Sequence, residues 1–261
     1  MSTAAERLRA LHAGPQPLIL PNVWDAVSAR AFASAGFAAL ATSSSAVAAM
    51  LGYRDGATPA EEMFAAIARI ASSVAVPVTA DVEAGYGLPP AELVRRLADC
   101  GVAGCNLEDS DPAMRMLTDP GRQVAYLSDV RAEAGADLVI NARVDVYVRP
   151  PAADRAHAGV GGVDVEAADE AVARANAYLA AGADCTYPIL APAAALPELV
   201  RRIDGPVNAM FRPGSPSLAE LAAMGVARIT FGGGLHAQVA RHVQDMADGL
   251  AAEVARLAGA G

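Results

Sequence analysis

Acidic side chains follow several apolar runs of the sequence, at the point where each run ends. Asp81 ends the run 76–81 and Glu83 lies two residues further on, so in an extended chain both point to one side. Glu108 ends the run 103–108. Carboxylates that crowd together repel each other unless a proton or a cation compensates their charge. A hard ion such as Mg²⁺ does this economically, because it binds one or two carboxylates directly and keeps several waters.

An arginine and a group of hydroxyl side chains end two other runs. Arg143 ends the run 138–143, so it should be partly buried and needs a partner, either Glu108 or an anionic substrate. Ser43 and Ser44 could donate hydrogen bonds to a carboxylate or phosphonate oxygen, although a plain loop would also explain them. No G-x-S-x-G motif surrounds these serines, so the signature of a serine hydrolase is missing.

Each of these charged residues also has an ordinary structural explanation, as a helix N-cap or a salt-bridge partner. Their position at the ends of consecutive runs favours a shared site instead, because strand ends meet at one rim of a barrel. A glycosidase would also use paired carboxylates. However, one Trp and 5% aromatic residues leave little material for the stacking platform that a sugar needs.

The composition excludes several classes of function. The 261 residues carry a net charge of −9 without a basic patch, which argues against a nucleic-acid partner. All 20 basic residues are Arg, and the lack of Lys excludes Schiff-base aldolases, pyridoxal-phosphate enzymes and the usual P-loop. Three cysteines without C-x-x-C spacing are expected to be free thiols. No secretory signal and no long apolar stretch is seen, so we expect a cytoplasmic protein without a membrane span.

Short apolar runs alternate with helix-length segments along the chain. The predicted strands are 18–23, 38–43, 76–81, 103–108, 138–143, 184–188, 206–210 and 228–231. The predicted helices are 24–35, 59–72, 89–100, 128–134, 166–181, 196–203, 217–224 and 236–258. This alternation indicates a parallel sheet with crossover helices. Eight such units favour a single α/β domain over 1–261, a (β/α)8 TIM-type barrel, and a doubly wound open sheet is the alternative.

Two Pro- and Gly-rich segments, 109–121 and 149–165, follow the fourth and fifth predicted strands. In a barrel both would be loops at the C-terminal rim, where active sites are built. His157 lies in the second segment and could reach the mouth of the barrel. The four histidines show no metal-ligand spacing, so no zinc site is predicted.

Four motifs together resemble the isocitrate lyase/phosphoenolpyruvate mutase superfamily. They are D-V-E-A-G-Y-G, N-L-E-D-S, N-A-R-V-D and the T-S-S-S…G-Y-R-D segment before them. The resemblance implies a modified β/α barrel that uses Mg²⁺, with Mn²⁺ as an alternative. It also implies small 2-keto or 2-hydroxy acid substrates, whose C–C or C–P bond is broken or formed through a pyruvate-like enolate.

The resemblance also assigns roles to the acids. Asp81 matches the direct metal ligand, and Glu83 stands where relatives often have a second Asp. Glu108 and Asp55 match the acids that hold metal-bound waters. Arg143 matches the arginine near the substrate, and the pair Ser43 and Ser44 matches the oxyanion-binding segment.

One loop departs from the family pattern. Isocitrate and methylisocitrate lyases carry a K-K-C-G-H-like loop soon after the acid of the fourth strand, whereas this chain reads S-D-P-A-M-R-M-L-T-D-P there, without Cys or Lys. The acid that protonates the leaving fragment must therefore come from elsewhere, from Tyr86 or from water. We expect a Mg²⁺-dependent C–C lyase, with a C–P mutase or hydrolase, or a non-catalytic barrel that binds small acids, as alternatives.

The resemblance further implies a homo-oligomer, a tetramer or a dimer, in which the C-terminal helix is exchanged between subunits. The amphipathic segment 236–258 could make this exchange. Packing of the same segment on its own barrel is the alternative.

Overall fold

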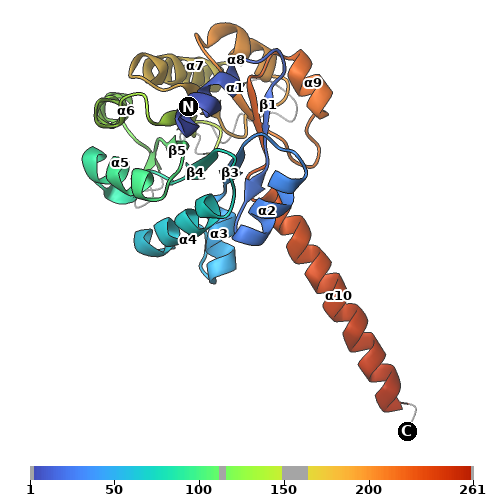
Figure 1. The fold of residues 1–261 in the computed structure, drawn as a ribbon. Helices are drawn as coiled ribbons and strands as arrows, with labels where there is room; N and C mark the ends of the chain where they lie inside the picture. The colour runs from blue at the N-terminus through green and yellow to red at the C-terminus, as the bar shows by residue number, and fades with distance from the viewer. Residues whose placement is uncertain (1–2, 112–115, 149–163, 260–261) are drawn as a thin grey trace.

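The computed structural model describes residues 3–111, 116–148 and 164–259, and shows parallel strands surrounded by helices (Figure 1). The segment with His157 lies outside the described residues. The parallel strands are β1 (Leu18–Leu20), β2 (Asn22–Val23), β3 (Leu40–Thr42), β4 (Val78–Asp81), β5 (Gly104–Glu108), β8 (Val139–Val144), β9 (Cys185–Pro188), β10 (Asn208–Met210) and β11 (Arg228–Thr230). A short antiparallel pair, β6 (Ser110–Asp111) with β7 (Met116–Leu117), follows β5.

The parallel strands close into a barrel. Six of them pair in the order β2-β3-β4-β5-β8-β9, and β1, β11 and β10 pair in a second run. A bridge between Thr186 and Val207 joins β9 to β10, while β1 continues into β2 across Pro21. These links complete the ring. The predicted TIM-type barrel is therefore confirmed, and the alternative of a doubly wound open sheet is wrong.

Helices cover the outside of the barrel and one of its ends (Figure 1). They are α1 (Ala4–His12), α2 (Ala26–Ser34), α3 (Ser44–Leu51), α4 (Ala60–Ser72), the 3-10 turn η1 (Gly85–Gly87), α5 (Pro90–Asp99), α6 (Pro120–Ala134), α7 (Val165–Ala180), α8 (Leu196–Arg202), α9 (Leu218–Ala223) and α10 (Gly234–Gly259). All eight predicted helices are present. The helices α1 and α3 were not predicted, and α6 begins inside the segment that the sequence predicted as a rim loop.

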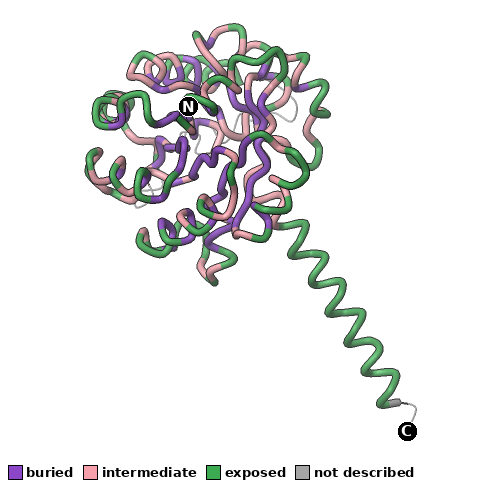
Figure 2. The backbone as a smooth tube through the Cα atoms, viewed as in Figure 1, coloured by how far each residue is buried: buried purple, intermediate pink, exposed green. Residues whose placement is uncertain are grey.

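The N-terminal end of the barrel is closed by α1. Thr3 and Glu6 form a capping box that starts this helix. Leu8 is fully buried and packs against Leu18 and Val139 at the strand starts. Apolar side chains therefore seal this end, and the buried strands form the centre of the molecule in Figure 2.

Alternation along each strand decides which side chains reach the barrel interior. In β8, Ile140 and Ala142 belong to the main hydrophobic cluster between the strands and the helices. Asn141 and Arg143 point the other way, into the barrel. The same alternation in β4 and β5 brings Asp81 and Glu108 to the interior side at the C-terminal rim.

The last helix, α10, projects away from the barrel as an isolated rod (Figures 1 and 2). Val239, Val243, Met246, Leu250 and Val254 along it are all exposed. The predicted helix is confirmed. Its first turn contacts the barrel, where the His236 ring packs edge-on against Trp24, and the rest of the helix does not pack on its own barrel. None of the described helices has the length and hydropathy that a membrane span requires.

Candidate active site

Asp81 is the last residue of β4 and is held by the chain segment that precedes α3. Its backbone N–H donates to Thr42 Oγ1 at 2.9 Å. Its Oδ2 accepts hydrogen bonds from the backbone N–H and the hydroxyl of Ser44, at 3.0 and 2.8 Å. Ser43 is the N-cap of α3, so the positive end of that helix faces the carboxylate. The hydroxyl run is thus a helix start rather than a loop, and it fixes Asp81.

Glu83 lies in a tight turn directly after β4. Its φ of 52° is left-handed, and its carbonyl oxygen accepts a hydrogen bond from the backbone N–H of Glu108 at 2.9 Å. Burial raises the pKa of Glu83 to about 7, and the charges of Asp81 and Asp55 add to this shift. Glu83 Oε1 is buried without a hydrogen-bond partner among the described residues. The turn therefore places a second carboxylate near Asp81, and Arg143 and Tyr86 offset only part of the rise in its pKa.

The other two predicted acids belong to the same cluster. Burial raises the pKa of Glu108 to about 8 against the opposing effect of Arg143, and Asp81 and Glu83 are among the charges that raise it. Burial and the charge of Asp81 also raise the pKa of Asp55. The structure thus brings the four predicted metal-site acids near one another at one rim.

Arg143 forms two ion pairs inside the mouth. Its Nη1 lies 2.6 Å from Glu108 Oε2, and its Nε and Nη2 donate to the two oxygens of Asp145 at 2.5 and 3.0 Å. Asp145 is fully buried and its own N–H donates to Asp109. The sequence expected one partner for Arg143, and the structure shows that two carboxylates hold it.

Asp145 was not predicted as a site residue. It lies two residues after Arg143, the same spacing that pointed to Asp81 and Glu83, so the N-A-R-V-D run contained the signal. Its neighbour Asp109 has a structural part, because it accepts hydrogen bonds from Tyr178 at 2.7 Å and Arg174 at 3.1 Å.

Tyr86 lies beside the acid cluster, in the turn after β4. Its ring packs edge-on against Phe64, with 5.8 Å between the centroids. Its hydroxyl is buried beside the Glu83 carboxylate and meets no other partner among the described residues. Burial and the charge of Glu83 raise the pKa of this hydroxyl far above its usual value. Tyr86 therefore keeps its proton next to Glu83.

A glycine-rich turn after β11 packs against the serine segment. Ser43 and Ser45 share a hydrogen bond of 3.0 Å between their hydroxyl groups. A Cβ at Gly233 would lie 2.9 Å from Ser45 Oγ, so only glycine allows this approach. The turn after β11 therefore lies against the start of α3 at the mouth.

Comparison with known proteins gives the family. A family model described as phosphoenolpyruvate phosphomutase matches residues 8–251. The chain belongs to this family. The uncharacterized protein Rv1998c of Mycobacterium tuberculosis is 32% identical over 223 residues, which cover 85% of this chain and 80% of that protein. A "Probable 2-methylisocitrate lyase 2" of Corynebacterium glutamicum is 34% identical over 183 residues, 69% of this chain and 57% of that protein.

A solved structure of this phosphomutase-family fold is also similar. The "putative phosphonomutase" from Burkholderia cenocepacia J2315 superposes with a TM-score of 0.85 at 39% identity, covering 94% of this chain and 99% of that one. The resemblance seen in the sequence motifs is therefore confirmed, and the chain is a member of an enzyme family of lyases and mutases.

A divalent cation fits the acid cluster of this family member. Asp55, Glu83 and Glu108 carry raised pKa values because burial and the neighbouring carboxylates disfavour their charged forms, and a bound cation would reverse this. Within the described residues, no three His, Cys, Asp or Glu side chains are arranged as a ready ligand set. A divalent ion held here would therefore have to reach most of these carboxylates through water.

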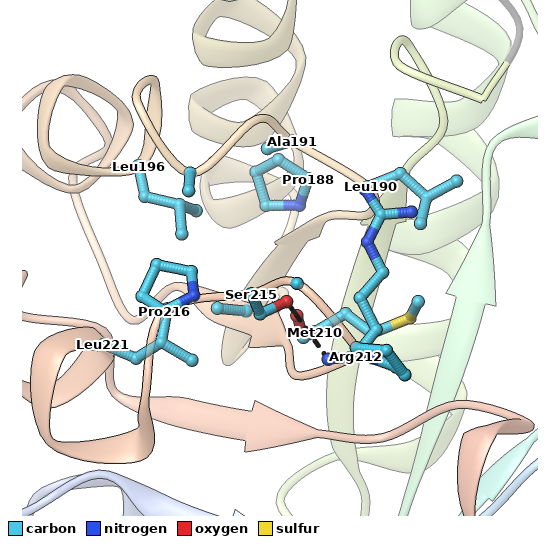
Figure 3. Close-up of a pocket in the computed structure, with 13 residues that line it drawn as sticks. Pro188, Leu190, Ala191, Leu196, Met210, Arg212, Ser215, Pro216 and Leu221 are labelled. Atoms are coloured by element: carbon cyan, nitrogen blue, oxygen red, sulfur yellow. Dashed lines mark hydrogen bonds between the residues drawn. The ribbon is translucent and has the colours of Figure 1, made fainter.

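Two cavities adjoin the same rim without containing the acid cluster. One of about 140 Å³ lies at the ends of β9 and β10, where Arg212 extends toward Leu190 above an apolar floor (Figure 3). The other, of about 480 Å³, lies between the turn after β4 and α6 and is lined by Arg122 and Tyr126. The four acids of the cluster therefore line neither of these two cavities.

Proposed function

We propose that this member of the phosphoenolpyruvate phosphomutase family is a Mg²⁺-dependent lyase. It would cleave a C–C bond of a small carboxylated 2-keto or 2-hydroxy acid through a pyruvate-like enolate, and Mn²⁺ would serve as an alternative ion. The crowding of Glu83 and Glu108 around Asp81 carries the proposal, because burial and the neighbouring carboxylates raise their pKa values, and a bound cation would favour their charged forms. The likeness to a probable 2-methylisocitrate lyase supports the reaction type.

The residues of the mouth have distinct parts in this proposal. Asp81 would bind the ion directly, with Asp55, Glu83 and Glu108 holding its waters. When bound, the ion would act as a Lewis acid on the oxygen where enolate charge develops. Arg143 adds a positive charge that its two carboxylate partners hold in place, so it needs no reorganisation during the reaction.

A proton must then reach the enolate carbon. The loop after β5 has neither Cys nor Lys, so it offers no thiol or ammonium as the donor. Tyr86 retains its proton beside Glu83, and we assign it, or a water next to it, as the donor. Tyr86→Phe would then slow turnover while leaving Mg²⁺ binding intact.

The proposal is tested by a substrate panel. Oxaloacetate, substituted malates, 2-methylisocitrate and phosphonopyruvate are each supplied with Mg²⁺ or with EDTA, and release of pyruvate, glyoxylate or another keto acid is followed. We expect cleavage of at least one acid that requires Mg²⁺ and is lost in Asp81→Ala. The matched control is Asp204→Ala, which removes an exposed acid far from the mouth. Binding of these acids without turnover in the wild type would favour the non-catalytic barrel.

Carbon–phosphorus chemistry is the second candidate function. The similarity to the Burkholderia "putative phosphonomutase" favours it, since that structure matches nearly the full length of this chain. In the same panel it predicts conversion of phosphonopyruvate, detected by ³¹P NMR, with no cleavage of the malates. The two reactions would use the same acid cluster.

We also propose that α10 packs against a second copy of the chain in a dimer or tetramer. Its exposed apolar side chains follow one another at three- and four-residue spacings along one stripe, and an isolated helix with such a stripe gains stability only by burying it. Light scattering of the full chain should show an oligomer, and Val243→Asp with Leu250→Asp should shift it toward monomer. A wild-type monomer would contradict this assembly.

A further inference from the structure

A fully buried arginine lies inside the barrel without a carboxylate partner in the part of the chain that the structure describes. Arg228 is the first residue of β11, is 0% exposed, and points inward because the next residue, Ile229, belongs to the outer hydrophobic cluster. Its Nη2 donates to Asn106 Oδ1 at 3.0 Å, while Nε and Nη1 have no hydrogen-bond partner among the residues described. No ion pair joins Arg228 to any described acid. Burying a cation without an ion pair costs free energy, so we infer the role of Arg228 from its one hydrogen bond, which it makes to Asn106.

Arg228 determines which way the Asn106 side chain is oriented. An arginine can only donate hydrogen bonds, so the atom of Asn106 that it contacts must be the carbonyl oxygen. Asn141 Nδ2 donates to that same oxygen at 2.8 Å, which leaves Asn141 Oδ1 buried without a partner. Two donors from two other strands thus fix the Asn106 amide in one of its two orientations.

The amide nitrogen of Asn106 is thereby left free. It donates to none of the described residues, and the Asn106 side chain belongs to a residue that is 6% exposed. Asn106 stands in register with Asp81 and two residues before Glu108, on the interior side of β5. Asn106 therefore lies in the layer of side chains next to the acid cluster, and its free N–H groups are on the side of the amide away from Arg228.

We propose that Asn106 donates a hydrogen bond to an oxygen of the bound acid, and that Arg228 is the positioning residue that keeps its amide nitrogen toward the mouth. The ligand is a carboxylate or enolate oxygen, since only an acceptor satisfies this N–H. This inference rests on the proposed function. Asn106 would be a neutral hydrogen-bond donor below the acid cluster. A cationic donor at this position would form ion pairs with the carboxylates, as Arg143 does with Glu108 and Asp145, and would be less free to bind the substrate.

Asn106→Asp tests the donor. The substitution keeps the shape and an oxygen for Arg228 and Asn141, but replaces the free N–H groups by a second oxygen. We expect kcat/KM to fall by about 10²-fold, the typical effect of losing one preorganised donor. The melting temperature should not fall, because the new carboxylate pairs with Arg228. The control is Asn176→Asp, an amide hydrogen-bonded to Arg202 and Asp204 away from the mouth, which should leave turnover unchanged.

Arg228→Met tests the positioning role separately. Methionine fills similar space and removes the two unpartnered nitrogens, so the melting temperature should hold or rise, whereas kcat should fall about tenfold as Asn106 loses its fixed orientation. Arg228→Lys, which can still donate to Asn106, should recover part of that loss. Activity that falls only in proportion to melting temperature in both variants would show a structural role and overturn the inference.

Oxalate binding separates this inference from the proposed function. Oxalate is a planar dianion that resembles an enolpyruvate, and its Mg²⁺-dependent affinity is measured by calorimetry. If the wild type neither binds oxalate nor turns over any acid, the proposed function fails. If the wild type binds oxalate and Asn106→Asp binds it within threefold as tightly, the proposed function stands and the inference is wrong.

Discussion

At the N-terminal end of the barrel two arginines share one carboxylate. At the C-terminal end five carboxylates lie around one arginine. Asp184, just before β9, accepts from Arg9 at 2.7 Å, from Arg131, and from the backbone N–H of Ile140 at 2.8 Å. The described acids of the mouth are Asp55, Asp81, Glu83, Glu108 and Asp145, with Arg143 among them. The first arrangement satisfies every oxygen, and the second leaves charge unpaired.

This difference separates stability from function within one barrel. The paired charges around Asp184 hold strand ends together, whereas the crowded acids of the mouth leave negative charge for a bound ligand to compensate. In β/α barrels the reactive groups gather at the C-terminal rim. In this barrel that rim has more carboxylates than arginines, whereas the N-terminal end has more arginines than carboxylates around Asp184.

Removal of Asp184 should have the largest effect on stability. Asp184→Ala leaves Arg9 and Arg131 without their carboxylate and frees the N–H of Ile140, so we expect a loss of about 3 kcal/mol in the free energy of unfolding. Urea unfolding measures this change. The folded fraction should keep its turnover rate. Asp81→Ala should show the reverse pattern, with turnover lost and stability unchanged, and equal stability losses in both variants would erase the distinction between the two ends.

A smaller effect is expected from His12, at the end of α1. Burial lowers its pKa from 6.5 to about 4, and the charge of Arg228 lowers it further, while Asp184 opposes the shift. Between pH 6.5 and about 4, His12 is therefore protonated in the unfolded chain and neutral in the folded chain. The free energy of unfolding falls as the pH drops through this range.

His12→Gln isolates this contribution. The variant should lose about 2 kcal/mol less than the wild type between pH 6.5 and 4, as measured by urea unfolding at each pH. Parallel stability curves for the two proteins would show that His12 is not the group that destabilises the N-terminal end in acid.

The strands and the acid cluster could be predicted from sequence because both follow local rules. Each apolar run became a strand, and the acids at the ends of 76–81 and 103–108 met at one rim because parallel strands end together. The helix α3 was missed because its start, Ser43 and Ser44, also reads as a polar loop. Its alanine-rich body gives little periodic contrast.

The internal amide network could not be predicted. Arg228 and Asn106 are 122 residues apart, and their contact depends on the register of strands that pair only after the barrel closes. Asp145 was not predicted as a site residue for a different reason. Its spacing from Arg143 was visible in the sequence, but the predicted strand ended at Arg143, so nothing placed Asp145 at the mouth. Side chains that depend on long-range register are therefore the part of this site that only the fold reveals.

The position of the metal ion tests the central claim most directly. Crystals of the wild-type chain grown with Mn²⁺ and measured at its absorption edge should show one strong anomalous peak at coordination distance from Asp81, with waters linking the ion to Glu83 and Glu108. A peak elsewhere, or an empty acid cluster at millimolar Mn²⁺, would contradict the account.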